Sequence, residues 1–482
     1  MHKDIIVVGA GISGIAAGYN LQKSCPEKTF AILEGRESLG GTWDLFKYPG
    51  VRSDSDMHTL GFRFKPWIHK KSIADGPSIL KYLNETVDDY NLRDKITYNQ
   101  KVIASNWVSD TSTWELTVDD NGQESSMSCN FLFLCGGYYS YDKPFMPDFP
   151  GMDEFNGRVI HPQFWDESLD YSNKKVVVIG SGATAVTLVP AIAESAKLTT
   201  MLQRSPSYVI SAPAEDSWNN ALNKVFPVKF TYFLIRWKNI LRTILGFYLS
   251  RKYPQRIKDR LINLVREELG QDFDVEKHFT PSYKPWDQRM CLVPDGDLFA
   301  AIKDNRANVV TDTINTFTPS GILLNSGNEI EADIVISATG IELNALNDIN
   351  VSVDGVKVEA NNKLSYKGMM LSGVPNLAIT FGYVNSSWTL RADLTCEYVC
   401  RLINTMDKEG CTACAPEADL NALVEDDYID FTSGYVQRAL DRLPKQGKKS
   451  PWRNYQNYLL DIFYVRFFAI KDSTLRFYNP KS

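Results

Sequence analysis

Two glycine-rich segments carry the first chemical signal in the sequence. Gly9, Gly11 and Gly14 form a G-x-G-x-x-G pattern between an apolar run and a helical pattern. In this context the first glycine makes a tight turn, the second lets a pyrophosphate approach the backbone, and the third lets helix and strand pack closely. Free N–H groups at the helix N-terminus then bind the phosphates. The segment therefore predicts a dinucleotide site.

An acidic residue indicates which dinucleotide this first site prefers. Glu34 follows Gly14 by about 20 residues, at the end of the expected second strand, where its carboxylate can accept hydrogen bonds from ribose hydroxyls. A carboxylate at this point repels a 2′-phosphate. We therefore expect FAD or NAD in the first site, and not NADP.

The second glycine-rich segment has the opposite charge at its far end. Gly180, Gly182 and Ala185 repeat the pattern with alanine in the third place, and the next strand ends in Arg204 and Ser205 instead of an acid. A guanidinium and a hydroxyl suit a 2′-phosphate. We expect NADPH here, bound by Gly180, Gly182, Thr184, Ala185, Arg204 and Ser205. Together, the two sites predict a flavoprotein that takes hydride from NADPH.

These motifs need two βαβ units to position them, and the hydrophobic pattern supplies both. Residues 4–34 and 174–204 each read as strand, turn, helix and strand. A helical pattern runs from about residue 217 to 276, and the tail after 387 alternates helix and loop. Further strands are expected at Lys101–Val118, Asn130–Cys135, Val309–Thr313, Gly321–Leu324 and Ala332–Ser337. The expected class is α/β with two Rossmann-like dinucleotide-binding domains.

Length and composition limit the range of functions. A chain of 482 residues suggests two or three domains, and 44% hydrophobic with 23% charged residues is typical of a globular protein. A net charge of −6 argues against nucleic acid as the main partner. An apolar strand begins directly after Asp4, which leaves no room for a signal peptide. We therefore expect a cytoplasmic protein.

The eight cysteines are too sparse for a disulfide scaffold, so free thiols are expected. Cys411 and Cys414, with Cys396 and Cys400 upstream, could form a four-thiolate zinc site. However, Cys396 and Cys400 have helical i, i+4 spacing, at which cysteine packs as a small apolar residue. We favour the core interpretation and expect no metal.

The helical stretch combines aromatic and basic residues and leaves two interpretations open. One is a peripheral membrane contact. The other, which we favour, is a lid helix whose apolar side covers the active site while its basic side chains reach water. The apolar runs are too interrupted to span a bilayer. Between residues 229 and 260 the only acid is Asp259, against the bases Lys229, Arg236, Lys238, Arg242, Arg251, Lys252, Arg256, Lys258 and Arg260.

Two longer motifs resemble those of a known enzyme family. Phe155, Gly157, His161 and Trp165, followed by Asp166, match the FxGxxxHxxxW(P/D) fingerprint of type I Baeyer–Villiger monooxygenases, which are class B flavoprotein monooxygenases. The second family motif, [AG]GxW…[FY]P[GM]xxxD, matches at full spacing between residues 40 and 54. The amino-acid sequence of that segment is similar to that of the ethionamide-activating subgroup in particular. The resemblance extends over essentially the whole chain.

The resemblance implies an FAD-dependent NADPH:O2 monooxygenase. Such enzymes convert ketones to esters or lactones through a C4a-peroxyflavin and oxidise sulfides as a side activity. The substrates implied are O2 and a small apolar ketone or sulfide. The NADP domain (150–212 and 286–338) would be inserted in the FAD domain (1–145 and 340–482), with a helical insertion at 213–285.

The resemblance also assigns roles to individual residues. Arg289 would be the catalytic cation that faces the flavin and stabilises an oxygen anion, and Asp54 would orient it. His161 and Trp165 would link domain rotation to catalysis, together with Phe155 and Gly157. Gln288 stands where other branches often have a lysine that binds the 2′-phosphate, so Arg204 would carry more of the NADPH preference. The residues expected to bind FAD are Gly9, Gly11, Ser13, Gly14, Glu34, Thr42, Trp43, Asp54, Val102 and Asn385.

Two other functions remain open at this point. A flavin-containing N- or S-oxygenase would act only on soft nucleophiles. A nucleotide-binding redox sensor would not oxygenate anything, and it would not couple NADPH consumption to a product.

Overall fold

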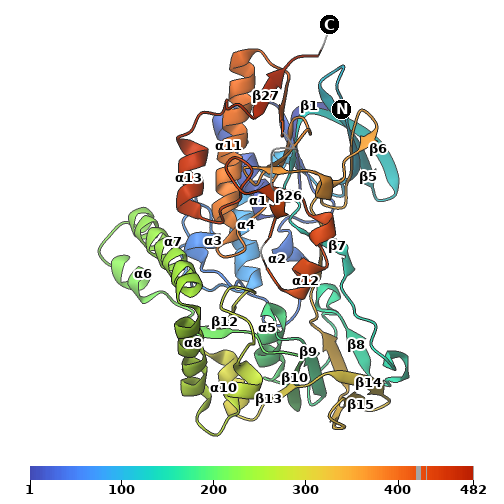
Figure 1. Cartoon of the computed structure of the whole chain (residues 1–482), viewed down its shortest axis with the longest axis vertical. Helices are drawn as coiled ribbons and strands as arrows, with labels where there is room; N and C mark the ends of the chain where they lie inside the picture. The colour runs from blue at the N-terminus through green and yellow to red at the C-terminus, as the bar shows by residue number, and fades with distance from the viewer. Residues whose placement is uncertain (419–424, 430, 481–482) are drawn as a thin grey trace.

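The computed structural model of the chain describes residues 1–418, 425–429 and 431–480. Two β-sheets lie one above the other in Figure 1, with helices packed around each. The strands of the lower sheet fall between residues 158 and 337, and those of the upper sheet precede and follow them in the chain. The expected α/β class with two Rossmann-like sheets is confirmed.

The upper sheet has nine strands and carries the first glycine segment. Its central strand β1 pairs in parallel with β2 and β6, so that Val8 lies beside Leu33 and Leu134. Strands β4, β5 and β6 form an antiparallel meander. The strands are β1 (His2–Val8), β2 (Phe30–Leu33), β3 (Ile96–Thr97), β4 (Lys101–Val108), β5 (Thr113–Asp120), β6 (Gln123–Leu134), β19 (Asn350–Val353), β20 (Val356–Lys357) and β23 (Leu377–Ile379).

The lower sheet is entirely parallel and carries the second glycine segment. Its order is β13-β10-β9-β17-β8, and its central strands are almost completely buried, as expected for a parallel sheet covered on both faces. The strands are β8 (Arg158–Ile160), β9 (Lys175–Ile179), β10 (Leu198–Gln203), β13 (Ala307–Thr311) and β17 (Ile334–Ser337). A small antiparallel sheet adds β14 (Ile314–Thr318), β15 (Gly321–Leu324) and β16 (Glu329–Glu331).

The other strands form two-stranded ribbons. These are β7 (Tyr139–Pro144) with β18 (Ile341–Leu343), β11 (Val209–Ala212) with β12 (Cys291–Pro294), β21 (Ser365–Tyr366) with β22 (Met370–Leu371), β24 (Ala413–Pro416) with β27 (Leu475–Tyr478), and β25 (Glu425–Asp427) with β26 (Lys445–Gly447).

The helices cover the sheets and also form the predicted helical segment. They are α1 (Ile12–Ser24), α2 (Thr42–Leu45), α3 (Met57–Leu60), α4 (Gly76–Asp89), α5 (Ala183–Ile192), α6 (Ser217–Leu222), α7 (Val228–Lys252), α8 (Pro254–Leu269), α9 (Val275–Phe279), α10 (Asp297–Lys303), α11 (Trp388–Glu409), α12 (Gly434–Gln437) and α13 (Tyr458–Arg466). Among the residues that the structure describes, no helix combines the length and the apolar character of a membrane-spanning segment.

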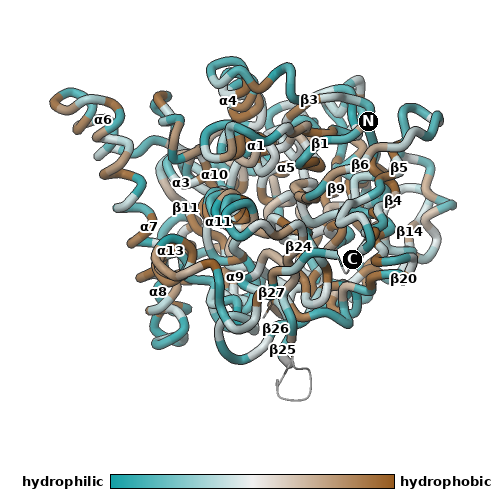
Figure 2. Tube along the Cα trace, turned by 90° about the horizontal axis from the view of Figure 1, so that it is seen from above, coloured by the Kyte–Doolittle hydropathy of each residue, from teal (hydrophilic) through white to brown (hydrophobic). Residues whose placement is uncertain are grey.

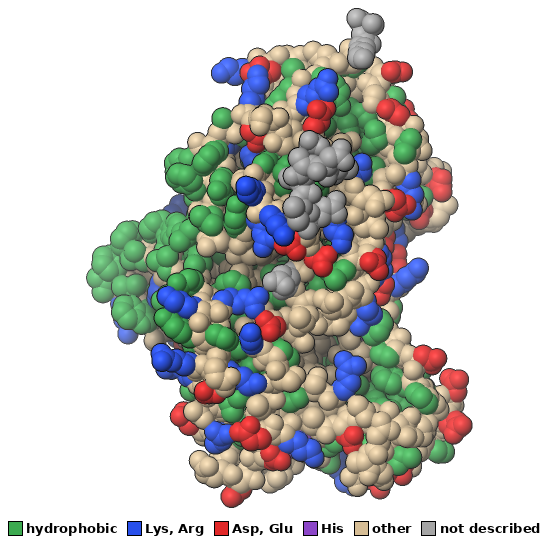
Figure 3. All heavy atoms as spheres, in the orientation of Figure 1, with side chains coloured by type: hydrophobic (Ala, Val, Ile, Leu, Met, Phe, Trp, Pro, Cys, Tyr) green, Lys and Arg blue, Asp and Glu red, His purple; other side chains and the backbone are tan. Residues whose placement is uncertain are grey.

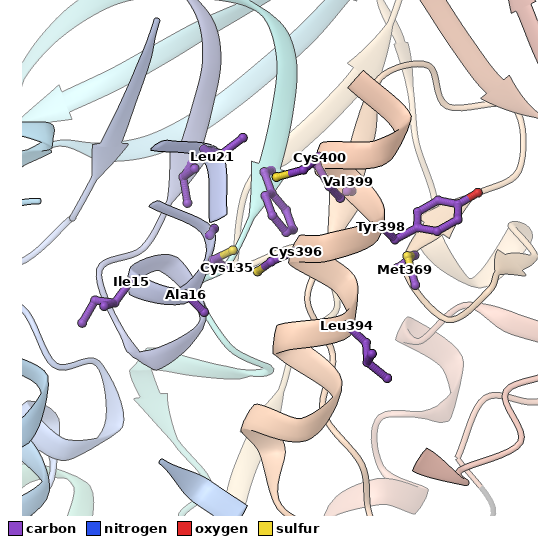
Figure 4. Packing of buried hydrophobic residues seen from close by; sticks show 14 of the residues in the cluster. Ile15, Ala16, Leu21, Cys135, Met369, Leu394, Cys396, Tyr398, Val399 and Cys400 are labelled. Atoms are coloured by element: carbon purple, nitrogen blue, oxygen red, sulfur yellow. The ribbon is translucent and has the colours of Figure 1, made fainter. Parts of the chain in front are cut away.

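Helices α1 and α11 pack against each other in the core of the upper part. Cys396 and Cys400 on α11 are buried and face the same cluster as Ile15, Ala16 and Cys135 (Figure 4). Burial raises the pKa of the Cys396 thiol well above its usual value, which keeps it neutral. These two cysteines therefore lie among apolar core residues, where the helical spacing placed them.

One arginine of the helical segment departs from the expectation that its basic side chains reach water. Arg236 on α7 is buried, and its guanidinium donates to the carbonyl oxygens of His58 and Gly61, both at 2.7 Å. It also lies 3.4 Å from the carboxylate of Asp393. The unpaired carbonyls at the end of the short helix α3 explain the difference, because a buried helix end needs donors.

Candidate active site

A cavity of about 1080 Å³ lies between the two sheets and is lined by both glycine segments. The volume exceeds the usual range for a single small ligand, about 300–1,000 Å³. Arg289 and Asp54 also line it, as do the cavity-facing predicted residues Gly9, Gly11, Ser13, Glu34, Thr42, Trp43, Val102, Gly180, Gly182, Thr184, Arg204 and Ser205.

The first glycine segment is held in shape by its own packing and by Glu34. Gly9 has a φ of +99°, and a Cβ on Gly14 would lie 1.8 Å from the carbonyl oxygen of Gly9. Neither position therefore tolerates a side chain. The buried carboxylate of Glu34 accepts hydrogen bonds from the N–H of Ala10 at 2.7 Å and of Arg36 at 3.1 Å. Burial raises the pKa of Glu34, and these hydrogen bonds oppose the shift.

The second glycine segment is tightly packed at Gly180, where a Cβ would lie 2.4 Å from the carbonyl oxygen of Ala338, but open at Gly182. A Cβ on Gly182 would meet no atom within 4 Å, whereas Ala185 is fully buried against the sheet. Arg204 is exposed at the cavity wall, and no ion-pair partner for it lies within the described part of the chain. The serine beside it is joined to the loop, because the hydroxyl of Ser181 donates to the carbonyl of Ser205 at 2.9 Å.

Arg289 and Asp54 form an ion pair with two contacts. Arg289 Nε lies 2.7 Å from Asp54 Oδ2, and a terminal nitrogen donates to Oδ1 at 3.0 Å. Both side chains are about one-third exposed, at 34% and 29%, so the pair faces the cavity and is not sealed in the core. The charge of Asp54 raises the pKa of Arg289. The guanidinium is therefore a permanent cation in a fixed orientation.

The fingerprint around His161 lies where the chain crosses between the sheets. Nδ1 of His161 accepts the N–H of Gln163 at 3.1 Å, which leaves the ring proton on Nε2, 3.3 Å from the carbonyl oxygen of Gly340. Burial lowers the pKa of His161, so a neutral ring is favoured. A Cβ on Gly157 would lie 2.3 Å from the carbonyl oxygen of Asp333, which explains the glycine. Phe155 and Trp165 pack into the lower core.

Two predicted FAD-site residues form hydrogen bonds with aromatic residues outside the predicted set. Thr42 is hydrogen-bonded to the hydroxyl of Tyr139, and Ser13 accepts a hydrogen bond from the indole of Trp388 at 2.8 Å. Asn385 differs from the expectation. Its amide donates to the carbonyl of Gln456 at 3.0 Å, and it is not among the residues that line the cavity.

The structure adds residues that the motifs did not indicate. Tyr435 and Arg438, on and just after α12, line the cavity, and the C-terminal segment is tied to the arginine segment by a hydrogen bond from Thr432 N to Asp287 O at 2.9 Å. No local pattern identifies them, because the contact joins segments about 145 residues apart. Gly136 and Gly137 also line the cavity, and a glycine pair one residue after the end of a buried strand could have indicated them from the sequence.

The lid interpretation of the helical segment is wrong. None of the described residues from 213 to 285 lines the cavity. Its longest helix instead packs along α3 and carries apolar side chains on its outer face.

The two loops fit dinucleotides on structural grounds. Gly11 and Gly182 are the N-cap residues of helices α1 and α5, and neither helix has a side chain that caps its first turn. The first-turn residues of both helices line the cavity. The N–H groups of these first turns have no side-chain acceptor, so they can donate hydrogen bonds to a pyrophosphate. An acid near one loop and an unpaired arginine near the other distinguish the two sites.

Two family models match the chain. Residues 73–408 match a model described as flavin-binding monooxygenase-like, and residues 7–70 match an NAD(P)-binding Rossmann-like domain.

Relatives along the full length include two bacterial proteins. The FAD-containing monooxygenase EthA of Mycobacterium tuberculosis (strain ATCC 25618 / H37Rv) is 51% identical over 477 residues, covering 99% of this chain and 98% of the relative. The probable FAD-binding monooxygenase AlmA of Acinetobacter baylyi is 47% identical over 480 residues, covering 99% and 96%.

Solved structures share the fold. An oxidised steroid monooxygenase bound to NADP superposes with a TM-score of 0.77 at 20% identity, covering 99% of this chain and 100% of that one. Cyclohexanone monooxygenase bound to epsilon-caprolactone gives 0.77 at 20% identity, covering 99% of each chain.

Proposed function

The chain belongs to the flavin-binding monooxygenase-like family, and we propose that it acts as a Baeyer–Villiger monooxygenase on apolar ketones. It is an FAD-dependent monooxygenase of the EthA type. When bound and reduced by NADPH, the flavin supplies the activated oxygen, of which one atom enters the bond beside the substrate carbonyl. The protein must bind both cofactors, place the ketone and stabilise developing negative charge.

Cofactor selection rests on the residues at the two glycine segments. The first segment binds FAD through backbone N–H groups at Gly11 and the start of α1, with Glu34 at the ribose end. The second binds NADPH, and the unpaired guanidinium of Arg204 attracts the 2′-phosphate. Gln288 lines the same cavity but adds no charge, so Arg204 carries most of the discrimination against NADH.

The Arg289–Asp54 ion pair is the observation that carries the proposal. A cation in the cavity between the two loops stabilises negative charge on oxygen during transfer. Asp54 makes two contacts with the guanidinium, which fixes its direction and leaves part of its edge free for a reacting oxygen. Arg289 is thus the proposed catalytic residue, and Asp54 is a positioning residue.

The cavity wall suits an apolar substrate. Phe46, Tyr48, Tyr138 and Trp388 all line it. The ring of Tyr138 stacks on Trp388 with centroids 5.1 Å apart and planes 18° apart, forming one aromatic surface. This supports small apolar ketones as substrates, with sulfides as a side activity of the same oxidant. A cytoplasmic location, where NADPH is available, is part of the proposal.

Product analysis tests this function. The purified yellow protein is incubated with NADPH and air and with a linear ketone or an aryl methyl sulfide in separate vials, and products are identified by mass spectrometry. We expect an ester from the ketone. Sulfoxide alone would contradict the proposal and indicate an N/S-oxygenase, and NADPH binding without any coupled product from a panel of ketones would indicate a sensor.

A further inference from the structure

Large hydrophobic side chains that are exposed gather in one region of the molecule. Among the described residues, all but Met1, Ile68, Phe164 and Val356 lie either between Trp218 and Leu264 or between Tyr455 and Phe468. Phe230 is 47% exposed, Leu245 is 56% exposed and Phe467 is 73% exposed. Scattered exposed apolar residues are ordinary, but a concentrated group marks a binding surface.

The two sequence segments form one continuous surface. Trp237 on α7 lies against Tyr458 at the start of α13, with ring centroids 6.3 Å apart. In Figure 2, α6 and the beginning of α7 project from the body of the molecule. In Figure 3, hydrophobic side chains cover the left edge, where Figure 1 places α6, α7 and α13. We call this region the apolar face.

Basic residues border the apolar face. Residues 229–260 contain nine Lys and Arg but only one acid, within a chain whose net charge is −6. On α7, Phe230, Leu241, Leu245 and Tyr248 share one side of the helix by their spacing, and the exposed bases lie next to this side. Exposed bases for which the described residues offer no ion-pair partner include Lys224, Lys229, Arg242 and Arg260.

We propose that α6, α7 and α13 form a docking surface for an anionic lipid bilayer. Apolar and aromatic side chains would enter the boundary between headgroups and acyl chains, and the bordering bases would contact lipid phosphates. Charge argues for this occupant over a second copy of the chain. A symmetric dimer through the apolar face would place the bases of one copy against those of the other.

The apolar face lies close to the segment that carries the catalytic cation. Phe247 on α7 contacts Trp286 with ring centroids 5.6 Å apart, and Trp286 precedes Arg289 by three residues. An apolar ketone dissolved in the bilayer would therefore be concentrated near the segment that leads to Arg289.

Vesicle flotation of the flavin-loaded full chain tests the proposal, and it needs neither NADPH nor turnover. The protein is mixed with vesicles of phosphatidylcholine alone or of phosphatidylcholine with phosphatidylglycerol. We expect it to float with the anionic vesicles only. Phe230→Ser with Leu245→Ser should lower the partition coefficient by about tenfold or more. Val356→Ser, a change at an apolar residue on β20 that is more exposed than either, should leave it unchanged.

A charge variant distinguishes binding to anionic lipid from nonspecific hydrophobic adsorption. Lys229→Glu with Arg242→Glu should weaken binding to anionic vesicles by about tenfold or more, and added salt should abolish the difference. Equal flotation of the wild type and the serine double variant would overturn the proposal, as would failure to bind anionic vesicles. Light scattering that shows a dimer dissociated by the serine changes would assign the apolar face to self-association instead. Flavin absorbance confirms that each variant is folded.

Discussion

At the scale of single residues, two arginines that line the cavity differ in whether an acidic side chain holds them. Arg289 is held by Asp54 in two contacts, whereas Arg204 projects into the cavity without an ion-pair partner among the described residues. A fixed cation suits a reacting oxygen atom whose position is defined. An unpaired cation is available for a ligand phosphate.

Replacing Arg289 should remove oxygenation without removing the flavin. Arg289→Ala is expected to lower ketone turnover by about 10²–10³-fold, the usual effect of losing one group that stabilises an oxyanion. FAD content, read from absorbance, should stay the same because Arg289 is not part of the glycine segment. Arg289→Lys should recover part of the turnover since it keeps the charge. Unchanged ketone turnover in the alanine variant would exclude Arg289 from the mechanism.

Replacing Arg204 should separate the two nicotinamide cofactors. Arg204→Ala is expected to raise the Michaelis constant for NADPH by about 10–100-fold, the value of a hydrogen bond to a charged group. The constant for NADH should hardly change, because NADH has no 2′-phosphate. Steady-state kinetics with both cofactors measures this. An equal rise for both would show that Arg204 does not bind the phosphate.

The sequence predicts residues well where the chemistry is local. Glu34 and Arg204 each follow a glycine segment at a spacing fixed by one βαβ unit, and both lie at the cavity. Asn385 shows the limit. Its amide donates to the backbone of Gln456, a partner about 70 residues away that no local pattern reveals.

At the scale of elements, the second and third positions of the glycine motif differ in how tightly they are packed. The Gly14 position is filled by the backbone of Gly9, whereas the Gly182 position is open. The same motif therefore serves close helix packing at one position and ligand approach at the other.

This difference predicts contrasting effects of alanine. Gly14→Ala should destabilise the protein by about 1–3 kcal/mol or more, because its Cβ would overlap the carbonyl oxygen of Gly9. Gly182→Ala should leave the melting temperature and FAD content unchanged and weaken only NADPH binding. Thermal unfolding and NADPH titration of both variants measure this. A similar loss of stability in the two variants would contradict the packing argument.

Secondary structure was predictable for the long periodic segments. The two βαβ units and the helical stretch of α6 to α9 appear where the hydrophobic pattern placed them. The pattern did not show which way the apolar side of α7 faces. Amphipathic periodicity identifies a face but not its partner, and the lid interpretation failed for that reason. Short elements such as α12 are defined by contacts between residues distant in sequence, so no sequence pattern predicted them.

At the scale of the whole molecule, a hydrogen bond links the ring of His161 to the carbonyl oxygen of Gly340, where the chain crosses between the two sheets. Gly340 follows the last strand of the lower sheet, where the chain returns to the upper part. The division into an FAD domain and an inserted NADP domain remains a prediction, with boundaries near residues 145–150 and 338–340. Rotation of one sheet relative to the other about this junction would move the buried His161 ring.

Titration of the His161 ring makes the stability of the protein depend on pH, and the direction follows from the burial of the ring. The pKa of His161 is lowered from 6.5, so the unfolded chain binds this proton more readily than the folded protein. Its contribution to stability is therefore present above about pH 6.5 and is lost as the pH falls. His161→Gln keeps a hydrogen-bond donor but does not titrate. The drop in melting temperature between about pH 7.5 and about pH 5.5 should be smaller in this variant. An identical drop in both proteins would show that the ring does not control it.

The central claim is that the cavity between the two sheets uses NADPH and O2 to insert an oxygen atom beside a carbonyl. Turnover of a linear ketone under ¹⁸O2, followed by mass spectrometry of the product, tests this most directly. The account predicts an ester with one labelled oxygen atom for each NADPH oxidised. NADPH oxidation that yields only labelled hydrogen peroxide, with every ketone in a panel recovered unchanged, would contradict it.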